Sequence, residues 1–219
     1  MKLELVIGNK NYSSWSMRPW VLLKQAQIPF EEVQLKFEEA GGKLGVAGIQ
    51  KYSAAGKVPV LLIDGEPVWD TLAICETVAE MFPGKHLWPQ TAEARRVARS
   101  ACAEMHSGFQ ALRSRMPMNI RSRYPGKGMN DEVAKDIARV SALWAAATGP
   151  FLFGEFCAAD AFYAPVATRL VTYGVELEGA ARDYQQRLLA SPAVTAWSAD
   201  ALKETEFVAM DEPYATPPR

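Results

Sequence analysis

Hydrophobic and polar positions follow clear periods over the first third of the chain. Residues 3–7 alternate and then run apolar, which predicts a strand. Residues 16–27 carry apolar side chains at helical spacing, with Ser16 placed to cap the helix and Pro19 tolerable in its first turn. Residues 30–35 alternate again and predict a second strand. Because two strands joined by a helix normally pair in parallel through a right-handed crossover, this segment predicts a small parallel unit.

A hairpin and a second helix complete this patterned region. Two apolar runs between residues 58 and 69 are joined by the Asp-Gly pair at 64–65, the strongest short hairpin signal in a sequence. Pro67 marks the second run as an edge strand, because proline lacks a backbone N–H. Residues 70–81 then predict a helix. The stretch 38–56 is rich in glycine and weakly patterned, so we expect a loop there.

The pattern changes completely after residues 83–91, a segment punctuated by proline and glycine. From residue 92 onward no convincing strand pattern remains, and alanine-rich helical stretches cover 92–116, 131–147, 158–173, 178–190 and 192–203. The sequence therefore predicts an α/β domain over residues 1–82, a linker over 83–91 and an all-helical domain over 92–219.

Composition and charge exclude several classes of function. The 219 residues are 49% hydrophobic and 22% charged, which is typical of a folded globular protein. The formal net charge of -1 argues against nucleic acid or an anionic membrane as the main partner. No run reaches the ~18 apolar residues of a membrane span, and three widely spaced cysteines indicate a reducing, cytoplasmic setting. The two histidines are not spaced as metal ligands are, so we do not expect a metal site.

Four motifs resemble those of the cytosolic glutathione S-transferases. Residues 13–18, SSWSMR, match S-x-x-S-x-R, closest to the zeta-class SSCS and tau-class SPFS patterns. Residues 53–61, SAAGKVPVL, resemble N-P-x-G-x-V-P-x-L, and residues 70–74, DTLAI, resemble E/Q-S-x-A-I. Residues 151–160, FLFGEFCAAD, resemble the G-D-x-S/T-x-A-D element that begins a central helix. Residues 103–109 and 117–121 are similar to a bacterial branch of these enzymes. The resemblance implies a thioredoxin-like glutathione-binding domain followed by a helical bundle.

The resemblance assigns the catalytic role to a serine. Glutathione is the implied co-substrate, and its thiol, with a free pKa of about 8.5, reacts as the thiolate. The family pattern gives Ser13 the thiolate-binding hydroxyl, Ser14 the place of a neighbouring donor and Ser16 the cap. Free N–H groups at the helix start add positive potential there. The alternative is that all three serines are only loop and cap residues.

The same resemblance implies that Val58 binds the cysteinyl part of glutathione through its backbone, which Pro59 orients by a cis peptide bond. Lys57, and less directly Lys43, is placed to meet the glycyl carboxylate, although a lone lysine is usually just solvated.

Asp70 and Thr71 begin the second helix, where free N–H groups accept a carboxylate. In the family they hold the γ-glutamyl end, Thr71 at the carboxylate and Asp70 at the ammonium. A simple N-cap pair is the alternative, and both interpretations can hold together.

We expect the electrophile to lie between the domains, against an adaptable apolar wall. The candidates are Trp15, Met105, His106, Phe109, Leu112, Met116 and Met118. Core packing is the alternative for the methionine and aromatic stripe, and a packed or surface histidine for His106. The arginines 113, 115, 121 and 123 form a basic cluster, either a solvated helix face or a site that attracts an anion.

Two departures from the family pattern bear on activity. Trp15 replaces the cysteine of the zeta-class SSCS, which argues against maleylacetoacetate isomerase activity, and no thiol takes the place of a redox cysteine. Cys157 stands where relatives have a capping serine or threonine, so we expect Asp160 to reach back to the N–H of residue 157. The cysteines otherwise predict buried, small apolar residues.

These observations give two functional hypotheses. The first is a cytoplasmic, homodimeric glutathione transferase of the detoxification type that conjugates or isomerises a small apolar electrophile. The second is a glutathione- or ligand-binding protein on the same fold without useful turnover.

Overall fold

The computed structural model describes residues 1–40 and 43–215. Its N-terminal elements are β1 (Leu3–Ile7), α1 (Ser14–Gln25), β2 (Glu31–Gln34), β3 (Phe37–Ala40), β4 (Lys43–Val46), β5 (Val60–Ile63), β6 (Glu66–Trp69) and α2 (Thr71–Met81). The main sheet has the order β2-β1-β5-β6. β1 pairs with β2 in parallel and with β5 antiparallel, and β6 forms the edge beside β5. This mixed sheet confirms the thioredoxin-like arrangement that the resemblance implies.

Two local predictions in this half are wrong. Ser13, not Ser16, is the N-cap of α1, because the helix already begins at Ser14 and the Ser13 hydroxyl accepts from the Ser16 N–H. The stretch 38–56 is not all loop, since β3 and β4 form a separate antiparallel hairpin. Both strands have only four residues, and β4 contains a glycine, so their alternation is too short to recognise in the sequence.

Helices make up the C-terminal half: α3 (Ala92–Ser107), α4 (Gln110–Arg115), α5 (Asp131–Ala145), α6 (Ala158–Thr172), α7 (Gly179–Leu189) and α8 (Pro192–Ala201). The single helix predicted over 92–116 is therefore wrong, because it breaks at Gly108 and Phe109. A side chain at Gly108 would come within 2.7 Å of the Glu104 carbonyl oxygen. Phe109 itself takes a positive φ of 55°.

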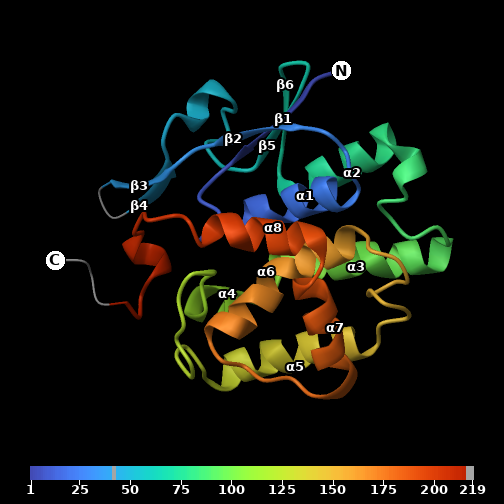
Figure 1. Ribbon diagram of the computed structural model, residues 1–219, viewed down its shortest axis with the longest axis vertical. Coiled ribbons are helices and arrows are strands. Elements are labelled where there is room, and N and C mark those ends of the chain that lie inside the picture. Colours follow the sequence, from blue (N-terminus) through green and yellow to red (C-terminus); the bar gives the residue numbers. More distant parts are fainter. Residues whose placement is uncertain (41–42, 216–219) are drawn as a thin grey trace.

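Helix α6 lies at the centre of the molecule and packs against α1, α3 and α7 (Figure 1). Asp160, in its first turn, accepts from the backbone N–H of Cys157 at 2.8 Å, as predicted, and from that of Leu152 at 3.0 Å. The hydroxyl of Tyr184 also donates to Asp160, at 2.9 Å. Because one continuous hydrophobic core includes residues of α1, α2 and all the C-terminal helices, the two halves are joined by packing and not only by the chain.

The chain after α8 passes beside the β3–β4 hairpin of the α/β half (Figure 1). It includes a short 3₁₀ helix, η3 (Ala209–Asp211). The Met210 N–H donates to the Glu39 carboxylate at 2.9 Å. Cys75, Cys102 and Cys157 are all buried and unbridged, as predicted. Within the described residues, none of the helices has the length and apolar character needed to cross a membrane.

Candidate functional site

Two adjoining cavities open between the α/β half and the helices. The first, here called the serine cavity, has a volume of about 400 Å³, and Ser13, Ser14, Phe37, Met118, Arg169 and Asp211 are among its lining residues. The second, the Asp70 cavity, has about 590 Å³, and Asp70, Thr71, Pro59 and His106 are among the residues that line it. Trp15, Lys57, Val58, Gln110 and Arg113 line both, so the cavities share a wall.

The serine cavity reaches the start of α1. The hydroxyl oxygens of Ser13 and Ser16 lie 2.7 Å apart, and the Ser16 oxygen also accepts from the Gly8 N–H at 3.2 Å. Because either hydroxyl of such a pair can donate, a proton of Ser13 is available to the cavity when Ser16 donates to Ser13. Ser14 occupies the first position of the helix beside it and lines the same cavity.

The β3–β4 hairpin forms another wall of the serine cavity, through Phe37, Leu44 and Val46. A side chain at Gly8 would come within 2.6 Å of the Phe37 ring, so glycine lets the hairpin approach β1. The Phe37 N–H donates to the Asn9 side chain at 2.8 Å, which holds the hairpin against the loop before α1.

The peptide bond between Val58 and Pro59 is cis, as predicted. Val58 is half-buried and Lys57 is exposed at the mouth shared by the two cavities. The side chain of Lys43 lies outside what the structure describes.

Asp70 and Thr71 stand where β6 turns into α2. Asp70 is the N-cap, and its Oδ1 accepts from the Leu72 N–H at 2.9 Å. Its φ of 74° is unusual for a residue with a side chain. The buried Thr71 hydroxyl donates to the Trp15 carbonyl at 3.1 Å, linking the starts of α1 and α2.

The predicted electrophile residues divide into two groups. Met118 and Trp15 line the serine cavity. Met105 and Phe109 are core residues that are not among the lining residues of either cavity, and Phe109 packs edge-to-face on Tyr163 at 6.4 Å. Leu112 and Met116 are likewise fully buried. His106 lines the Asp70 cavity and not the serine cavity, because α3 ends beside the start of α2.

Trp15 stands between cationic groups. The Arg18 guanidinium carbon lies 4.3 Å from the Trp15 ring centre and that of Arg113 lies 4.7 Å from it. Arg18 is fully buried and also lies 5.0 Å from the Phe162 ring, and burial lowers its pKa to about 9. Burial lowers the pKa of Arg113 as well.

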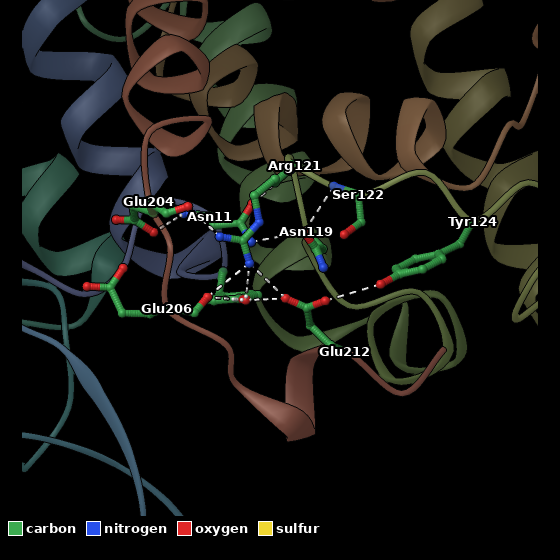
Figure 2. A network of polar contacts seen from close by, with 9 residues as sticks. Asn11, Asn119, Arg121, Ser122, Tyr124, Glu204, Glu206 and Glu212 are labelled. Carbon is green, nitrogen blue, oxygen red and sulfur yellow. Dashed lines mark hydrogen bonds and ion pairs between the residues drawn. The ribbon is translucent and has the colours of Figure 1, made fainter. Parts of the chain in front are cut away.

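The predicted basic cluster is not one surface. Arg113 faces the cavities, whereas Arg115 donates to the Gly128 carbonyl at 3.3 Å. Arg123 donates to the carbonyls of Ile120 and Ser122. Arg121 turns the other way, toward the C-terminal segment (Figure 2).

Two lining residues of the serine cavity, Arg169 and Asp211, were missed in the sequence. Arg169 is buried in α6, donates from Nε to the Met116 carbonyl at 3.0 Å, and has no partner for Nη1 among the described residues. Burial lowers its pKa to about 10. Burial raises the pKa of Asp211 to about 6. Arg169 is the only basic residue of the mostly apolar helix α6 and lies in its last turn, which was the available signal for it. No sequence signal pointed to Asp211.

A polar network fixes the segment that carries Asp211 (Figure 2). The Arg121 guanidinium donates to the Tyr12 hydroxyl at 3.0 Å, the Glu206 carbonyl at 2.9 Å and the Glu212 carboxylate at 3.1 Å. The Tyr124 hydroxyl donates to the other oxygen of Glu212 at 3.1 Å. Because Glu212 follows Asp211 directly, this network holds Asp211 in the wall of the serine cavity.

Residues 12–81 match the family profile described as glutathione S-transferase, N-terminal domain. The α/β half of the chain is therefore similar to the N-terminal domain of the glutathione S-transferases. The matched segment contains Ser13, Val58, Asp70 and Thr71, the residues that gather around the two cavities.

Solved glutathione transferases share the whole fold. A glutathione transferase homologue from Burkholderia gl BGR1, solved with bound glutathione, is 22% identical, covers 92% of this chain and 98% of its own, and has a TM-score of 0.71.

Curated relatives carry an isomerase name. A probable maleylacetoacetate isomerase of Caenorhabditis elegans is 26% identical over 65% of this chain and 66% of its own length. The maleylacetoacetate isomerase of Mus musculus is 31% identical over 47% of each. The matched region thus spans about half to two thirds of the length of these relatives.

Among residues 1–40 and 43–215, no group of three or more histidine, cysteine or acidic side chains is gathered as metal ligands would be.

Proposed function

We propose that this protein is a glutathione transferase. The observation that carries the proposal is that Ser13, Ser14, Val58, Asp70 and Thr71, which are far apart in the sequence, line two adjoining cavities that share a wall. A peptide that lies across that wall has one end beside Asp70 and Thr71, its middle beside the Val58 backbone, and a side chain directed toward Ser13 and Ser14. The Burkholderia glutathione transferase homologue, solved with bound glutathione, supports the same ligand.

Glutathione binds with its γ-glutamyl end in the Asp70 cavity and its thiol toward the serine cavity. The N-terminus of α2 at Thr71 receives the γ-glutamyl carboxylate, and the Asp70 carboxylate receives the ammonium. The Val58 backbone pairs with the cysteinyl residue, and Pro59 shapes the cavity beside it. Lys57, exposed at the shared mouth, meets the glycyl carboxylate.

The start of α1 stabilises the thiolate. Ser13 or Ser14 donates a hydrogen bond to the sulfur, and the free N–H groups of the first helical turn add positive potential. In the Ser13 case the Gly8 N–H and Ser16 hydroxyl form a chain behind the donating group, which polarises it further.

The electrophile occupies the serine cavity. Pro117, Met118 and Trp15 give it an apolar wall, and Arg113 and Arg169 add positive charge. This wall fits an electrophile with an apolar body and an acidic group better than the purely apolar one expected from the sequence. The sulfur bonds to the electrophilic carbon, and in a conjugation the leaving group departs with the electron pair of the broken bond.

Isomerisation is the second candidate function, because the curated relatives are named maleylacetoacetate isomerase and the two arginines suit an acidic substrate. Trp15 in place of the zeta-class cysteine counts against it. A glutathione-binding protein without turnover is the remaining alternative.

Subunit assembly and location belong to the same proposal. We place the protein in the cytoplasm as a homodimer with a detoxification role. Two large apolar side chains support association: Trp69 on β6 is 54% exposed and Val97 on α3 is 52% exposed. They come from the α/β half and the helical half, which are the two surfaces that a dimer of this family joins.

Two matched chromogenic substrates test the proposal. Chlorodinitrobenzene is neutral and chloronitrobenzoate carries a carboxylate, and both lose chloride to a thiolate. We expect retention on immobilised glutathione, turnover of both, and a loss of about 10-fold in Arg169→Met for the benzoate alone, with Arg123→Met as control. Retention without turnover of any electrophile supports the binding protein; absence of retention contradicts the glutathione site itself.

A further inference from the structure

His106 brings the helical half of the chain to the γ-glutamyl end of the proposed glutathione site. It lies in the last turn of α3, and its Nε2 is 3.5 Å from Oδ2 of Asp70. Its side chain is 31% exposed and lines the Asp70 cavity. The two residues come from opposite sides of the boundary between the α/β and helical halves, so their contact joins the two halves in the wall of the cavity.

The imidazole is held in place from several directions. Its ring meets the edge of Trp15 at 5.0 Å, with an angle of 71° between the planes. The His106 carbonyl accepts from the Arg113 guanidinium at 3.2 Å, and the same nitrogen reaches the Gly108 carbonyl at 3.5 Å. The helix break at residues 108–109 makes this possible, because it turns α4 so that Arg113 returns over the end of α3.

Within the part of the chain that the structure describes, the two ring nitrogens of His106 have different surroundings. Nδ1 is buried and has no hydrogen-bond partner among the described residues, whereas Nε2 faces the Asp70 carboxylate. A neutral imidazole carries its proton on one nitrogen, so the arrangement favours the tautomer that donates from Nε2 toward Asp70.

The carboxylate oxygen of Asp70 that can bind a ligand is Oδ2. Oδ1 is committed to the Leu72 N–H at the start of α2, and Oδ2 faces His106. The backbone of Asp70 has a positive φ of 74°, a conformation that residues with a side chain disfavour. Contacts with the surrounding structure must therefore hold this residue in place beside the cavity. An additional contact that limits its side-chain rotation therefore matters for any cation that binds there.

We propose that His106 is a positioning residue of the glutathione site, which acts through Asp70 to orient Oδ2 toward the γ-glutamyl ammonium. This inference rests on the proposed glutathione site. It moves His106 from the electrophile wall to the binding of the peptide, and it makes recognition of a free γ-glutamyl ammonium depend on the helical half of the same chain. The ligand class it selects is a γ-glutamyl peptide with its amino group intact.

Three His106 variants test the proposal. Gln places an amide nitrogen near the position of Nε2, Asn is too short to do so, and Leu removes the donor. The ligands are S-methylglutathione and its deamino analogue, which lacks the γ-glutamyl ammonium. The control is His86→Gln, which changes the other histidine, at the end of the 3₁₀ helix η2 (Pro83–Lys85).

We expect His106→Leu and His106→Asn to weaken binding of S-methylglutathione about 10-fold, the effect of one charge-assisted hydrogen bond, and His106→Gln to stay within about threefold. All three should bind the deamino analogue as the wild type does. With glutathione as substrate, KM should rise in the Leu and Asn variants while kcat at saturation stays within about twofold.

The other possible results distinguish a failure of the His106 proposal from a failure of the proposed glutathione site. Equal losses of affinity for both ligands, or no loss of affinity in the Asn and Leu variants, overturn the proposed role of His106. Binding of S-methylglutathione by the wild type would still support the glutathione site in that case. If the Leu variant does not fold, the Asn and Gln pair gives the same comparison. Failure of the wild type to bind S-methylglutathione contradicts the proposed function itself.

Discussion

At the scale of single residues, Ser13 has two roles, and its neighbour Ser14 shares only one of them. It caps α1 and it lines the serine cavity, whereas Ser14 only lines the cavity from the first helical position. Ser13→Ala should therefore lower the free energy of unfolding by about 1 kcal/mol, the usual cost of a lost N-cap. If Ser13 also binds the thiolate, turnover should fall about 10- to 100-fold.

Urea unfolding and kcat of Ser13→Ala and Ser14→Ala, measured side by side, separate these roles. A stability loss without a rate loss in Ser13→Ala, together with a rate loss in Ser14→Ala, moves the catalytic role by one residue. Full activity in both variants means that the backbone N–H groups and the helix dipole are sufficient.

Asp211 should make stability depend on pH. Burial raises its pKa from the usual 3.8 to about 6, so the folded state holds this proton more tightly than the unfolded state. As pH rises from about 4 to about 6, the unfolded chain releases the proton first, and the free energy of unfolding falls. Asp211→Asn should remove this fall, on the order of 1–2 kcal/mol after solvent screening.

The measurement is urea unfolding of wild type and Asp211→Asn across that pH window. Asp183→Asn, at an exposed carboxylate on α7, is the control. Parallel pH profiles in wild type and Asp211→Asn would show that this carboxyl does not carry the effect.

Residues in local motifs could be predicted, and residues brought in by tertiary contacts could not. Ser13, Asp70 and Thr71 stand at or just before helices that the hydrophobic periodicity predicts. Their places at helix starts therefore followed from the sequence. Asp211 reaches the serine cavity only because the Arg121 network binds the segment around Glu212. No local pattern encodes a contact across so much of the chain.

At the scale of elements, the C-terminal segment depends on Arg121. Its guanidinium is the shared donor to Tyr12, Glu206 and Glu212, and Glu212 is buried. Arg121→Ala leaves that carboxylate without its cation, so we expect the free energy of unfolding to fall by about 2–4 kcal/mol.

Hydrogen exchange and limited proteolysis localise the effect of Arg121→Ala. Exchange should accelerate in residues 203–215 more than in α5 or α6, and turnover should fall with it, because Asp211 leaves the cavity wall. Arg123→Ala, which removes donors to carbonyls of the same loop only, is the matched control. Equal exchange in the two variants would contradict the proposed hold on the segment.

The elements also show where periodicity misleads. The helical pattern continues across residues 108–109, so α3 and α4 were predicted as one helix. The break comes from a close approach of backbone, where a side chain at Gly108 would meet the Glu104 carbonyl oxygen. The break lets Arg113 reach back to the His106 carbonyl. His106, at the end of α3, lies 3.5 Å from Asp70, so the structure places it at the Asp70 cavity and not at the electrophile wall expected from the sequence.

At the scale of the whole molecule, the exposed side chains of Trp69 and Val97 test the proposed homodimer. Val97→Glu replaces an exposed apolar side chain of α3 by a charged one and should convert a dimer into a monomer, as measured by light scattering at micromolar concentration. Val171→Glu, at a 39% exposed site on α6, should leave the dimer intact. A monomeric wild type at that concentration contradicts the dimer outright.

The central claim is that the start of α1 holds glutathione as its thiolate in a cavity between the two halves of the chain. The ultraviolet absorbance of the thiolate in the wild-type complex, titrated with pH against an S-methylglutathione complex as blank, tests it most directly. We predict a bound thiol that ionises well below the free value of about 8.5, so that thiolate is present at neutral pH. A bound thiol that titrates like free glutathione would contradict the account.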